Sequence, residues 1–580
     1  MGINKNITSA LFLLFSLCLS AQQNTVFSAP SVEKTTPESL FLHLNASTFV
    51  SGETLFYKIY SLNQVDNTIS QISKVAYVEL IDSKKNSIVK HKLFLKEGLA
   101  KSDLFVPITL KTGTYKLIAY TTWMLNKKES DVFQQEIFII NPFEELSENN
   151  IAKENENYVA TKVNGNSLPT NSTSELKVNL NKKTFNQREE AIINFTSSKN
   201  LSGNYSVSVR KTDSLPSPFM FSAFDFKNNS NKSSVSLDSK KIILPEMRGE
   251  LISGKIEAED KNLQVQNIAV ALSIPGKSFV FKIVRTNKQG EFFFIIDQNY
   301  QNQEYVIQVI GEKNIQYSVS INKKETVDLS KLSVANNFKI NSKIKNTLKE
   351  RSISSQIENA YFSKKTDSVT AVNQKYFYDP SSKSYRLDDY TRFATLRQSI
   401  TEVVKEMSYS RSGGKYIFHL KDFTAQTQVQ EPVLTLVDGI LVQDVSDIID
   451  YDAKNIEKIN IVPKGYIYGG TVTSGFVSIF TKDGSFNTDA LSTKFFNFNF
   501  DAVPQKEKIY FEQIYDAQTK SSRIPDFRQQ LLWLPELKLT EKNTKISLFT
   551  SDIPGNYEIS VEGFSEKGEP ISLKETFIVE

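Results

Sequence analysis

Residues 431–482 read EPVLTLVDGILVQDVSDIIDYDAKNIEKINIVPKGYIYGGTVTSGFVSIFTK, and this stretch decides how the rest of the chain is interpreted. Its three short apolar runs are each bounded by turn residues: 433–437, 458–462 and 476–480. Such runs are typical of buried β-strands. An Asp-Gly turn follows the first run, a short helical segment ends at Glu457, and a glycine-rich loop from Gly465 to Gly475 precedes the third run. The stretch therefore predicts a small α+β unit.

The order of strands and turns in this stretch resembles the plug domain of TonB-dependent outer-membrane receptors, whose approximate pattern is VDG…I…IEVLKGP…YG…G.I.I.TK. The matching residues are Val437-Asp438-Gly439, Tyr468-Gly469 and Thr481-Lys482. In such receptors a membrane barrel follows the plug, and it needs about 22 strands of roughly ten residues each. Only about a hundred residues follow the stretch here, so we expect a plug-like domain at 385–485 without a barrel. The resemblance implies that its glycine-rich loop is structural and binds no phosphate.

The composition favours strands and several domains. A chain of 580 residues is too long for one hydrophobic core, and a prior of roughly 100–200 residues per domain predicts about four or five domains. The 40 Phe and 23 Tyr residues, with frequent short runs of Val, Ile and Thr, favour pleated sheets over helices. The formal charge is only +4, with Lys and Arg scattered along the chain. This pattern excludes the basic patch of a nucleic-acid-binding or membrane-surface protein.

The first 22 residues are typical of a secretory signal peptide. A positive charge at Lys5 precedes a compact apolar run, and Ser20-Ala21-Gln22 offers a cleavage site. We therefore place a signal peptide at 1–22 and expect an exported protein, periplasmic or at the cell surface and associated with the outer membrane. The only cysteine, Cys18, lies inside this segment. Leu17 is a poor residue before a lipidated cysteine, and whether Cys18 is lipidated stays open.

A mature chain without cysteine has no disulfide, no thiolate zinc site and no cysteine nucleophile. It also lacks the cysteine of the internal thioester that protease-trapping macroglobulins use. No apolar run after the signal peptide reaches 18 residues, so the sequence predicts no transmembrane helix.

Residues 37–143 predict a first β-sandwich, because alternating apolar runs are separated by turns at the spacing of such folds. The segments FLHLNASTFVSGETLFYKIY, YVELID, GTYKLIAYTTWMLN and INPF resemble a macroglobulin-type β-sandwich in envelope proteins of Bacteroidota-type bacteria. In that pattern a Gly-Glu pair, here Gly52-Glu53, precedes the second strand. We expect Glu53 to be a structural turn carboxylate that accepts hydrogen bonds from nearby backbone N–H groups.

The rest of the chain divides by composition into further units. The polar segment 144–172 predicts a solvated linker, 173–242 a second β-sandwich and 243–330 a third. Within the third, TNKQGEFFF resembles carboxypeptidase-regulatory-like domains, which are accessory modules without peptidase chemistry, and Gly290 supplies its positive-φ turn.

The remaining boundaries rest on periodicity. Residues 331–384 predict a partly helical connector, and 387–404 an amphipathic helix because apolar residues recur every three or four positions. Residues 486–580 predict a C-terminal segment and β-sandwich, whose PDFRQQLLWLPEL and FTSDIPGNYEISVEG match the same envelope-protein resemblance. The predicted fold class is mainly β and multidomain: tandem β-sandwiches (macroglobulin/Ig-like) plus a small α+β plug-like domain.

The sequence offers no catalytic set. Its three histidines, His43, His91 and His419, are not at metal-ligand spacing, so we expect structural roles for them. No nucleophile elbow, P-loop or dinucleotide fingerprint is present. We therefore predict no catalytic, cofactor-binding or metal residues, no cofactor and no enzymatic activity.

The leading hypothesis is a non-enzymatic envelope scaffold or accessory subunit. It would dock on an outer-membrane β-barrel protein or on assembly or secretion machinery, through pairing of edge strands. One alternative is an accessory to TonB-dependent uptake that supplies a plug in trans. Another is a surface protein that binds glycans or peptides, with Trp123 and Trp533 as stacking platforms; burial is the commoner state of tryptophans in such segments.

Overall fold

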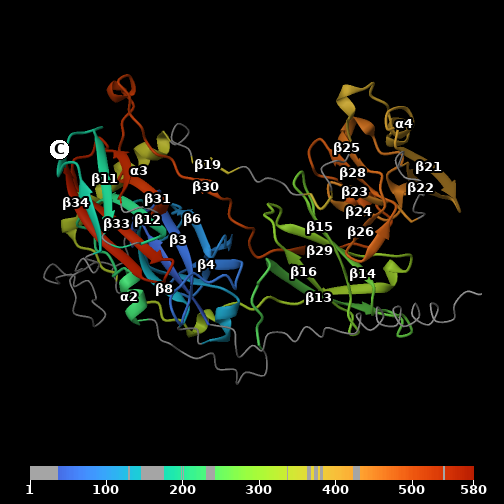
Figure 1. Cartoon of the computed structure of the whole chain (residues 1–580), viewed down its shortest axis with the longest axis horizontal. Coiled ribbons are helices and arrows are strands. Elements are labelled where there is room, and N and C mark those ends of the chain that lie inside the picture. Colours follow the sequence, from blue (N-terminus) through green and yellow to red (C-terminus); the bar gives the residue numbers. More distant parts are fainter. Residues whose placement is uncertain are drawn as a thin grey trace, which may run out of the picture.

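A computed structural model describes residues 37–127, 131–145, 175–197, 199, 201–229, 242–335, 338–361, 367–370, 376–378, 383–421, 431–539 and 543–580. The expected signal peptide and nearly all of the expected linker 144–172 lie outside these ranges. Strands predominate and gather in two lobes (Figure 1). The first lobe contains two β-sandwiches, and the second lobe contains a third sandwich and a smaller α+β unit. The mainly β, multidomain fold class is confirmed.

The first sandwich lies within residues 38–140. Its three-stranded sheet has the order β1 (Glu38–Leu44), β3 (Thr54–Asn63), β6 (Leu99–Phe105). Its five-stranded sheet has the order β2 (Thr48–Val50), β8 (Phe133–Ile140), β7 (Gly113–Tyr120), β4 (Val75–Ile81), β5 (Ser87–Phe94). Large aromatic side chains such as Phe41, Tyr60 and Tyr120 are almost fully buried and belong to the apolar cluster of this lobe, to which such rings contribute large apolar areas.

The second sandwich is built from two segments far apart in the sequence. One supplies β9 (Leu176–Leu180), β10 (Thr184–Phe185), β11 (Glu190–Ser197) and β12 (Gly203–Lys211). The other supplies β31 (Gln530–Leu539), β32 (Asn543–Phe549), β33 (Gly555–Ser565) and β34 (Pro570–Val579). The sheets have the orders β10-β34-β33-β12-β31 and β32-β11-β9.

The sequence predicted separate modules at 173–242 and 486–580, and the structure corrects this. Val207 of β12 pairs with Leu534 on one side and Val561 on the other, so the early strand lies between two late ones. The physical reason is that β9–β12 are too few to form both sheets around an apolar core. Each sheet of the second sandwich therefore includes strands from β31–β34. Alternating apolar residues indicate which face of a strand is buried but not which strand covers it.

The third sandwich has sheets β16-β13-β18 and β15-β14-β17-β29. Its strands are β13 (Glu250–Ala258), β14 (Ala269–Ile274), β15 (Val280–Arg285), β16 (Glu291–Ile296), β17 (Glu304–Val309), β18 (Tyr317–Ile321) and β29 (Phe496–Asn499). Gly290 has φ +80° in the turn before β16, as predicted. The strand β29 comes from the segment that the sequence assigned to the C-terminal module.

We call residues 383–421 and 431–482 the distal unit. Its five-stranded sheet has the order β20 (Lys383–Arg386), β25 (Ile456–Val462), β28 (Phe476–Thr481), β23 (Leu434–Val437), β24 (Ile440–Val442). Two hairpins complete it, β21 (Met407–Ser412) with β22 (Lys415–Leu420), and β26 (Tyr466–Tyr468) with β27 (Thr471–Thr473). The strands predicted around the Asp-Gly turn are present. The helical segment expected before Glu457 consists of two short 3-10 turns, Val445–Asp447 and Ala453–Asn455.

The amphipathic helix predicted over 387–404 is much shorter in the structure. Only α4 (Leu396–Glu402) is α-helical. Its start is fixed by Thr395, whose side chain accepts from the Gln398 backbone N–H while the Gln398 side chain bonds back to Thr395. This capping box outweighs the apolar periodicity of the preceding residues.

Two helices and a short strand pair lie in the connections between the sandwiches and the lobes. The helix α2 (Ala223–Asn229) lies against the first lobe, and α3 (Lys345–Ala360) returns to the first lobe after the third sandwich (Figure 1). The short strands β19 (Ser368–Val369) and β30 (Lys508–Ile509) pair where the chain passes between the lobes. Within the described ranges, no helix has the length and apolar character needed to cross a bilayer.

Candidate functional site: the junctions and cleft between the lobes

The Asp-Gly turn of the distal unit is seated on the third sandwich. Asp438 and Gly439 both have positive φ, 47° and 87°, as a two-residue hairpin loop requires. Asp438 is fully buried, and one of its carboxylate oxygens accepts from the Thr481 backbone N–H at 2.9 Å. The Asp438 carbonyl accepts from the Gly276 N–H of the third sandwich at 3.0 Å. Hydrogen bonds therefore connect the Asp438-Gly439 turn both to Thr481 in its own unit and to the third sandwich.

The glycine-rich loop makes a second contact with the same sandwich. The Tyr468 hydroxyl donates to the Phe281 carbonyl at 2.7 Å, and Arg285 donates to the Gly470 carbonyl at 3.0 Å. A Cβ added at Gly469 would lie 2.2 Å from the Ile283 carbonyl oxygen. The glycines thus allow close approach of two backbones, which is the structural role predicted for this loop.

The sheet of the distal unit is buried on both faces. One face packs against α4 and the hairpin β21–β22 in a shared apolar core. The other face forms a core with the third sandwich, to which Phe279, Phe281, Leu436 and Phe476 contribute. This double coverage explains the nearly continuous apolar runs of its strands.

A buried polar cluster joins the first sandwich to the third. The Lys92 ammonium lies 2.6 Å from a Glu250 oxygen, and the Tyr300 hydroxyl donates to the other Glu250 oxygen at 2.6 Å. Lys324 pairs with Glu246 at 2.8 Å. Burial lowers the pKa of Lys92 below its ordinary value, although Glu250 opposes this shift. Charges that are paired and hydrogen-bonded in this way fix one geometry between the two sandwiches.

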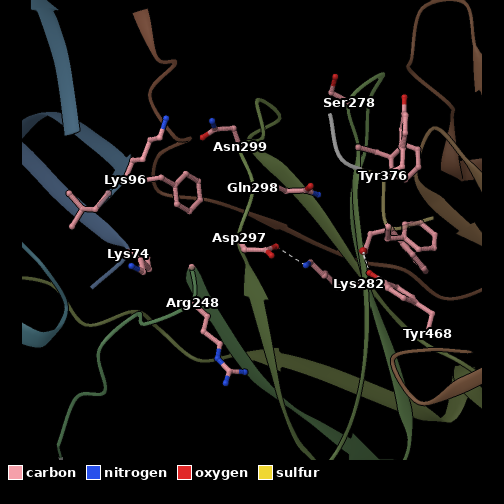
Figure 2. Close-up of a pocket in the computed structure, with 16 residues that line it drawn as sticks. Lys74, Lys96, Arg248, Ser278, Lys282, Asp297, Gln298, Asn299, Tyr376 and Tyr468 are labelled. Carbon is pink, nitrogen blue, oxygen red and sulfur yellow. Dashed lines mark hydrogen bonds and ion pairs between the residues drawn. The ribbon is translucent and has the colours of Figure 1, made fainter. Parts of the chain in front are cut away.

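A cleft opens beside this polar cluster, with a volume of about 690 Å³. Seven short stretches of the chain line it: Lys74, Phe94–Lys96, Arg248–Gly249, Ser278–Phe279 with Phe281–Lys282, Asp297–Asn299, Tyr376–Phe377 and Tyr468. In Figure 2 Lys74, Lys96 and Arg248 lie on one side of the cleft, and Lys282, Tyr376 and Tyr468 lie toward the other.

The charge of the cleft is predominantly positive. Lys282 is paired with Asp297 at 2.8 Å. Within the described ranges, the Lys74 ammonium donates to the neutral Gln71 side chain at 3.2 Å and to no carboxylate. Lys96 and Arg248 are exposed and form no ion pair with any residue in the described ranges. The arrangement can attract an anion, but it presents no nucleophile paired with a base.

Glu53 has the structural role that the sequence predicted, with partners that it did not. Its carboxylate accepts from the Val50 backbone N–H at 3.1 Å, as expected. It also accepts from the Arg351 Nε of α3 at 2.9 Å and from Arg210 of β12 at 3.1 Å. Burial alone would raise the pKa of Glu53, but the two arginines outweigh it and lower that pKa. Glu53 therefore anchors α3 and both sandwiches of the first lobe.

The histidines and tryptophans lie apart from the cleft. His43 is buried against the Ser206 hydroxyl at 2.7 Å, and burial lowers its pKa to about 3. His91 bonds to the Tyr57 hydroxyl at 2.8 Å with a pKa lowered to about 4, again by burial. His419 bonds to a nearby serine and is exposed. Trp123 and Trp533 are buried at 2% and 4% exposure, which removes them as surface stacking platforms.

Metal chemistry finds no support in the described ranges, where no three His, Cys, Asp or Glu side chains form a metal-binding group. The residues that line the cleft were not singled out from the sequence. They come from seven short stretches between residues 74 and 468, and no local spacing connects them. The sequence offered one weak signal for the cleft, which is the presence of Lys, Arg, Tyr and Phe at several predicted turns.

A buried carboxyl at the interface of the first two sandwiches gives a testable pH dependence. Burial raises the pKa of Glu562 to about 8, although the Ala223 N–H, the Ser572 hydroxyl and Lys574 favour its charged form. Between pH about 4.5 and 8 the unfolded chain releases this proton and the folded chain keeps it. Stability contributed by the neutral carboxyl is therefore complete below the unfolded pKa and is lost as the pH rises toward 8.

We expect the unfolding free energy to fall by roughly 2 kcal/mol between pH about 5.5 and 7.5 through this group alone. Urea unfolding of the wild type and of Glu562→Gln at both pH values checks this. The neutral glutamine removes the Glu562 contribution, so the difference between the two proteins should shrink or reverse as the pH rises. Parallel pH dependences in the two proteins would contradict the burial argument.

Comparison with known proteins identifies no family for this chain. No protein-family model and no curated protein matches the chain. A mutant of Salmonella alpha-2-macroglobulin has 9% identity over 94% of this chain and 40% of its own, with TM-score 0.23. Alpha-2-macroglobulin of Escherichia coli activated by porcine elastase has 9% identity over 93% and 44%, with TM-score 0.24. Dimeric latent PorU from Porphyromonas gingivalis has 10% identity over 50% and 33%, with TM-score 0.15.

The chain spans less than half the length of these solved structures. At such identities and TM-scores the likeness identifies neither a family nor an activity for this chain. The resemblance of the distal unit to receptor plugs, and of the third sandwich to carboxypeptidase-regulatory-like domains, stays a prediction.

Proposed function

We propose that this chain is an exported, non-enzymatic scaffold of the bacterial envelope that docks on an outer-membrane barrel protein, or on its assembly or secretion machinery, through the distal unit. The observation that carries the proposal is the position of that unit. It lies at the end of the second lobe with the hairpin β21–β22 and α4 outermost (Figure 1). Ile417 on this hairpin is 41% exposed, in a unit whose sequence resembles domains that contact barrels.

The way the distal unit is held favours docking over insertion into a barrel. One face of its sheet shares a core with the third sandwich, and the Asp438 and Gly470 carbonyls accept hydrogen bonds from that sandwich. Entry of the unit alone into a barrel lumen would require these contacts to break. These contacts therefore favour docking on the outside of a partner over supply of a plug in trans.

The surfaces left for docking are the outer hairpin and the sheet edge. The strand β20 is the last strand of the five-stranded sheet, so its outer backbone groups have no strand partner in the described ranges. Its side chains are mostly exposed. An edge of this kind can add a strand from a partner through backbone hydrogen bonds.

A photo-crosslinking residue placed at Ile417 tests the proposal in intact envelopes. We expect a light-dependent adduct with a membrane protein whose gel mobility changes on heating, as a barrel's does. Ile88 of the first lobe is the matched control, because it is also a strand isoleucine and is 40% exposed. Equal adducts from both positions, or adducts only with soluble proteins, would count against docking through the distal unit. Substrate turnover by the purified chain would contradict the non-enzymatic role.

A further inference from the structure

We propose that the cleft between the lobes is a binding site for a short carboxylated oligosaccharide, a function separate from docking by the distal unit. Its volume of about 690 Å³ lies in the range of sites for small ligands, roughly 300–1,000 Å³. A ligand of two or three sugar rings fits this size. The class of ligand follows from the charge, the rings and the backbone edges that line the cleft.

The uncompensated cations select an anion. The Lys282–Asp297 pair is internally neutral, which leaves Lys74, Lys96 and Arg248 to set the charge of the cleft. In a chain whose total formal charge is only +4, three such groups around one concavity concentrate positive potential there. The Arg248 guanidinium can bind a carboxylate through two parallel hydrogen bonds.

The opposite wall provides aromatic surfaces and small polar groups. Tyr376, Phe377 and Tyr468 are each half-buried, so part of each ring faces the cleft. Tyr376 stacks on Tyr378 with ring centroids 4.9 Å apart, which fixes its plane. The C–H face of a sugar ring packs against such rings. Its hydroxyls can bond to the side chains of Ser278, Gln298 and Asn299, which also line the cleft.

The strand edges beside the cleft argue against an extended peptide. The strand β15 is an edge strand, but its Phe281 carbonyl already accepts from the Tyr468 hydroxyl. On the other side, the edge strand β5 is covered where the Gln505 N–H donates to the Lys92 carbonyl at 2.8 Å. A peptide that binds by adding a strand needs these groups free. A ligand recognised by side-chain tips does not.

The walls of the cleft are held before any ligand arrives. The Lys92–Glu250 pair and the bond from Tyr300 to Glu250 fix the first sandwich against the third. The Tyr468 and Arg285 bonds fix the distal unit against the third sandwich. A preorganised site loses less entropy on binding.

Calorimetric titration of the full chain with a trimer of galacturonic acid tests the proposal, beside a neutral galactose trimer, inorganic phosphate and an acidic tetrapeptide. We expect the acidic trimer to bind at least about tenfold more tightly than the other probes, and more weakly at high salt. The variant Lys96→Ala/Arg248→Ala should lose about tenfold or more in affinity. Both side chains are exposed and unpaired within the described ranges, so the fold should be unaffected.

Two further variants separate site-specific binding from general effects. Lys288→Ala removes an exposed lysine that does not line the cleft and should leave the affinity unchanged. Tyr376→Ala should weaken binding while Tyr376→Phe retains it, because the ring face and not the hydroxyl is used. Equal binding of the neutral trimer, tighter binding of the peptide, or unchanged affinity in the double variant would each overturn the proposal. None of these outcomes bears on crosslinking at Ile417.

Discussion

Replacing Glu53 with alanine is expected to lower the free energy of unfolding of the first lobe by about 3–5 kcal/mol. Glu53 is 9% exposed and faces the guanidinium groups of Arg351 and Arg210. Arg351 itself is 4% exposed. Removing the carboxylate leaves two largely buried cations, and within the described ranges Asp213, 3.1 Å from Arg351, is the one carboxylate left to offset them. Most of the expected loss in unfolding free energy therefore comes from leaving buried arginine charges without a partner, and less comes from the lost hydrogen bonds themselves.

Hydrogen exchange of β2, β12 and α3 with increasing denaturant measures this loss in the lobe itself. Glu536→Ala is the control, because the Lys101–Glu536 pair at 2.6 Å has a carboxylate that is 49% exposed. Its removal should cost at most about 1 kcal/mol. Similar losses in the two variants would show that the Glu53 cluster is not stabilised by burial and pairing.

The same cluster predicts a sign for the pH dependence. The folded pKa of Glu53 lies below its ordinary value because the two arginines outweigh burial. Its contribution is therefore present above the unfolded pKa and is lost as the pH falls through the folded pKa. The unfolding free energies of the wild type and of Glu53→Ala should accordingly converge as the pH is lowered below the ordinary range of glutamate.

Gly439→Ala is the second change with a large expected effect, about 2–4 kcal/mol, because it combines backbone strain with overpacking. Gly439 has φ +87°, and an added Cβ would lie 2.3 Å from the Cβ of Phe279. Phe279 belongs to the core that the third sandwich shares with the distal unit. The clash should therefore loosen the junction of these two units and leave the first lobe intact.

Gly413→Ala is a matched control for this variant. Gly413 also has positive φ, +57°, but an added Cβ meets nothing within 4 Å. It should show only the strain of the left-handed conformation, about 1–2 kcal/mol. Limited proteolysis and hydrogen exchange at β15 and β23 compare the two. Equal protection at these strands in both variants would mean that the turn does not hold the junction.

Local structure could be predicted from this sequence wherever it depends on neighbouring residues. The Asp438-Gly439 turn was predicted because two adjacent positive φ values favour Asp-Gly. The positive φ of Gly290 followed in the same way. A nearby backbone donor for Glu53 was also predicted, since turn carboxylates commonly accept from local N–H groups, and the Val50 N–H is that donor.

Partners far along the chain could not be predicted. Arg351 lies 298 residues after Glu53, and no sequence pattern pairs them. The helix expected over 387–404 was wrong because a periodic apolar pattern does not indicate where a cap begins a helix, as Thr395 does here. The candidate cleft was missed for the same reason as the closure of the second sandwich. Both are assembled from segments that meet only in the folded chain.

The interleaved second sandwich has a consequence for how the protein matures. Ser208 of β12 and Gln530 of β31, whose side chains meet at 2.9 Å, are 322 residues apart. A polypeptide is synthesised from its N-terminus, so β9–β12 are made before β31–β34, and these strands wait with open edges while the third sandwich and the distal unit fold. Open edges of this kind invite misassociation, so a newly made chain should depend on chaperones until β31–β34 are complete. Closing this sandwich is expected to be the slowest step of biogenesis.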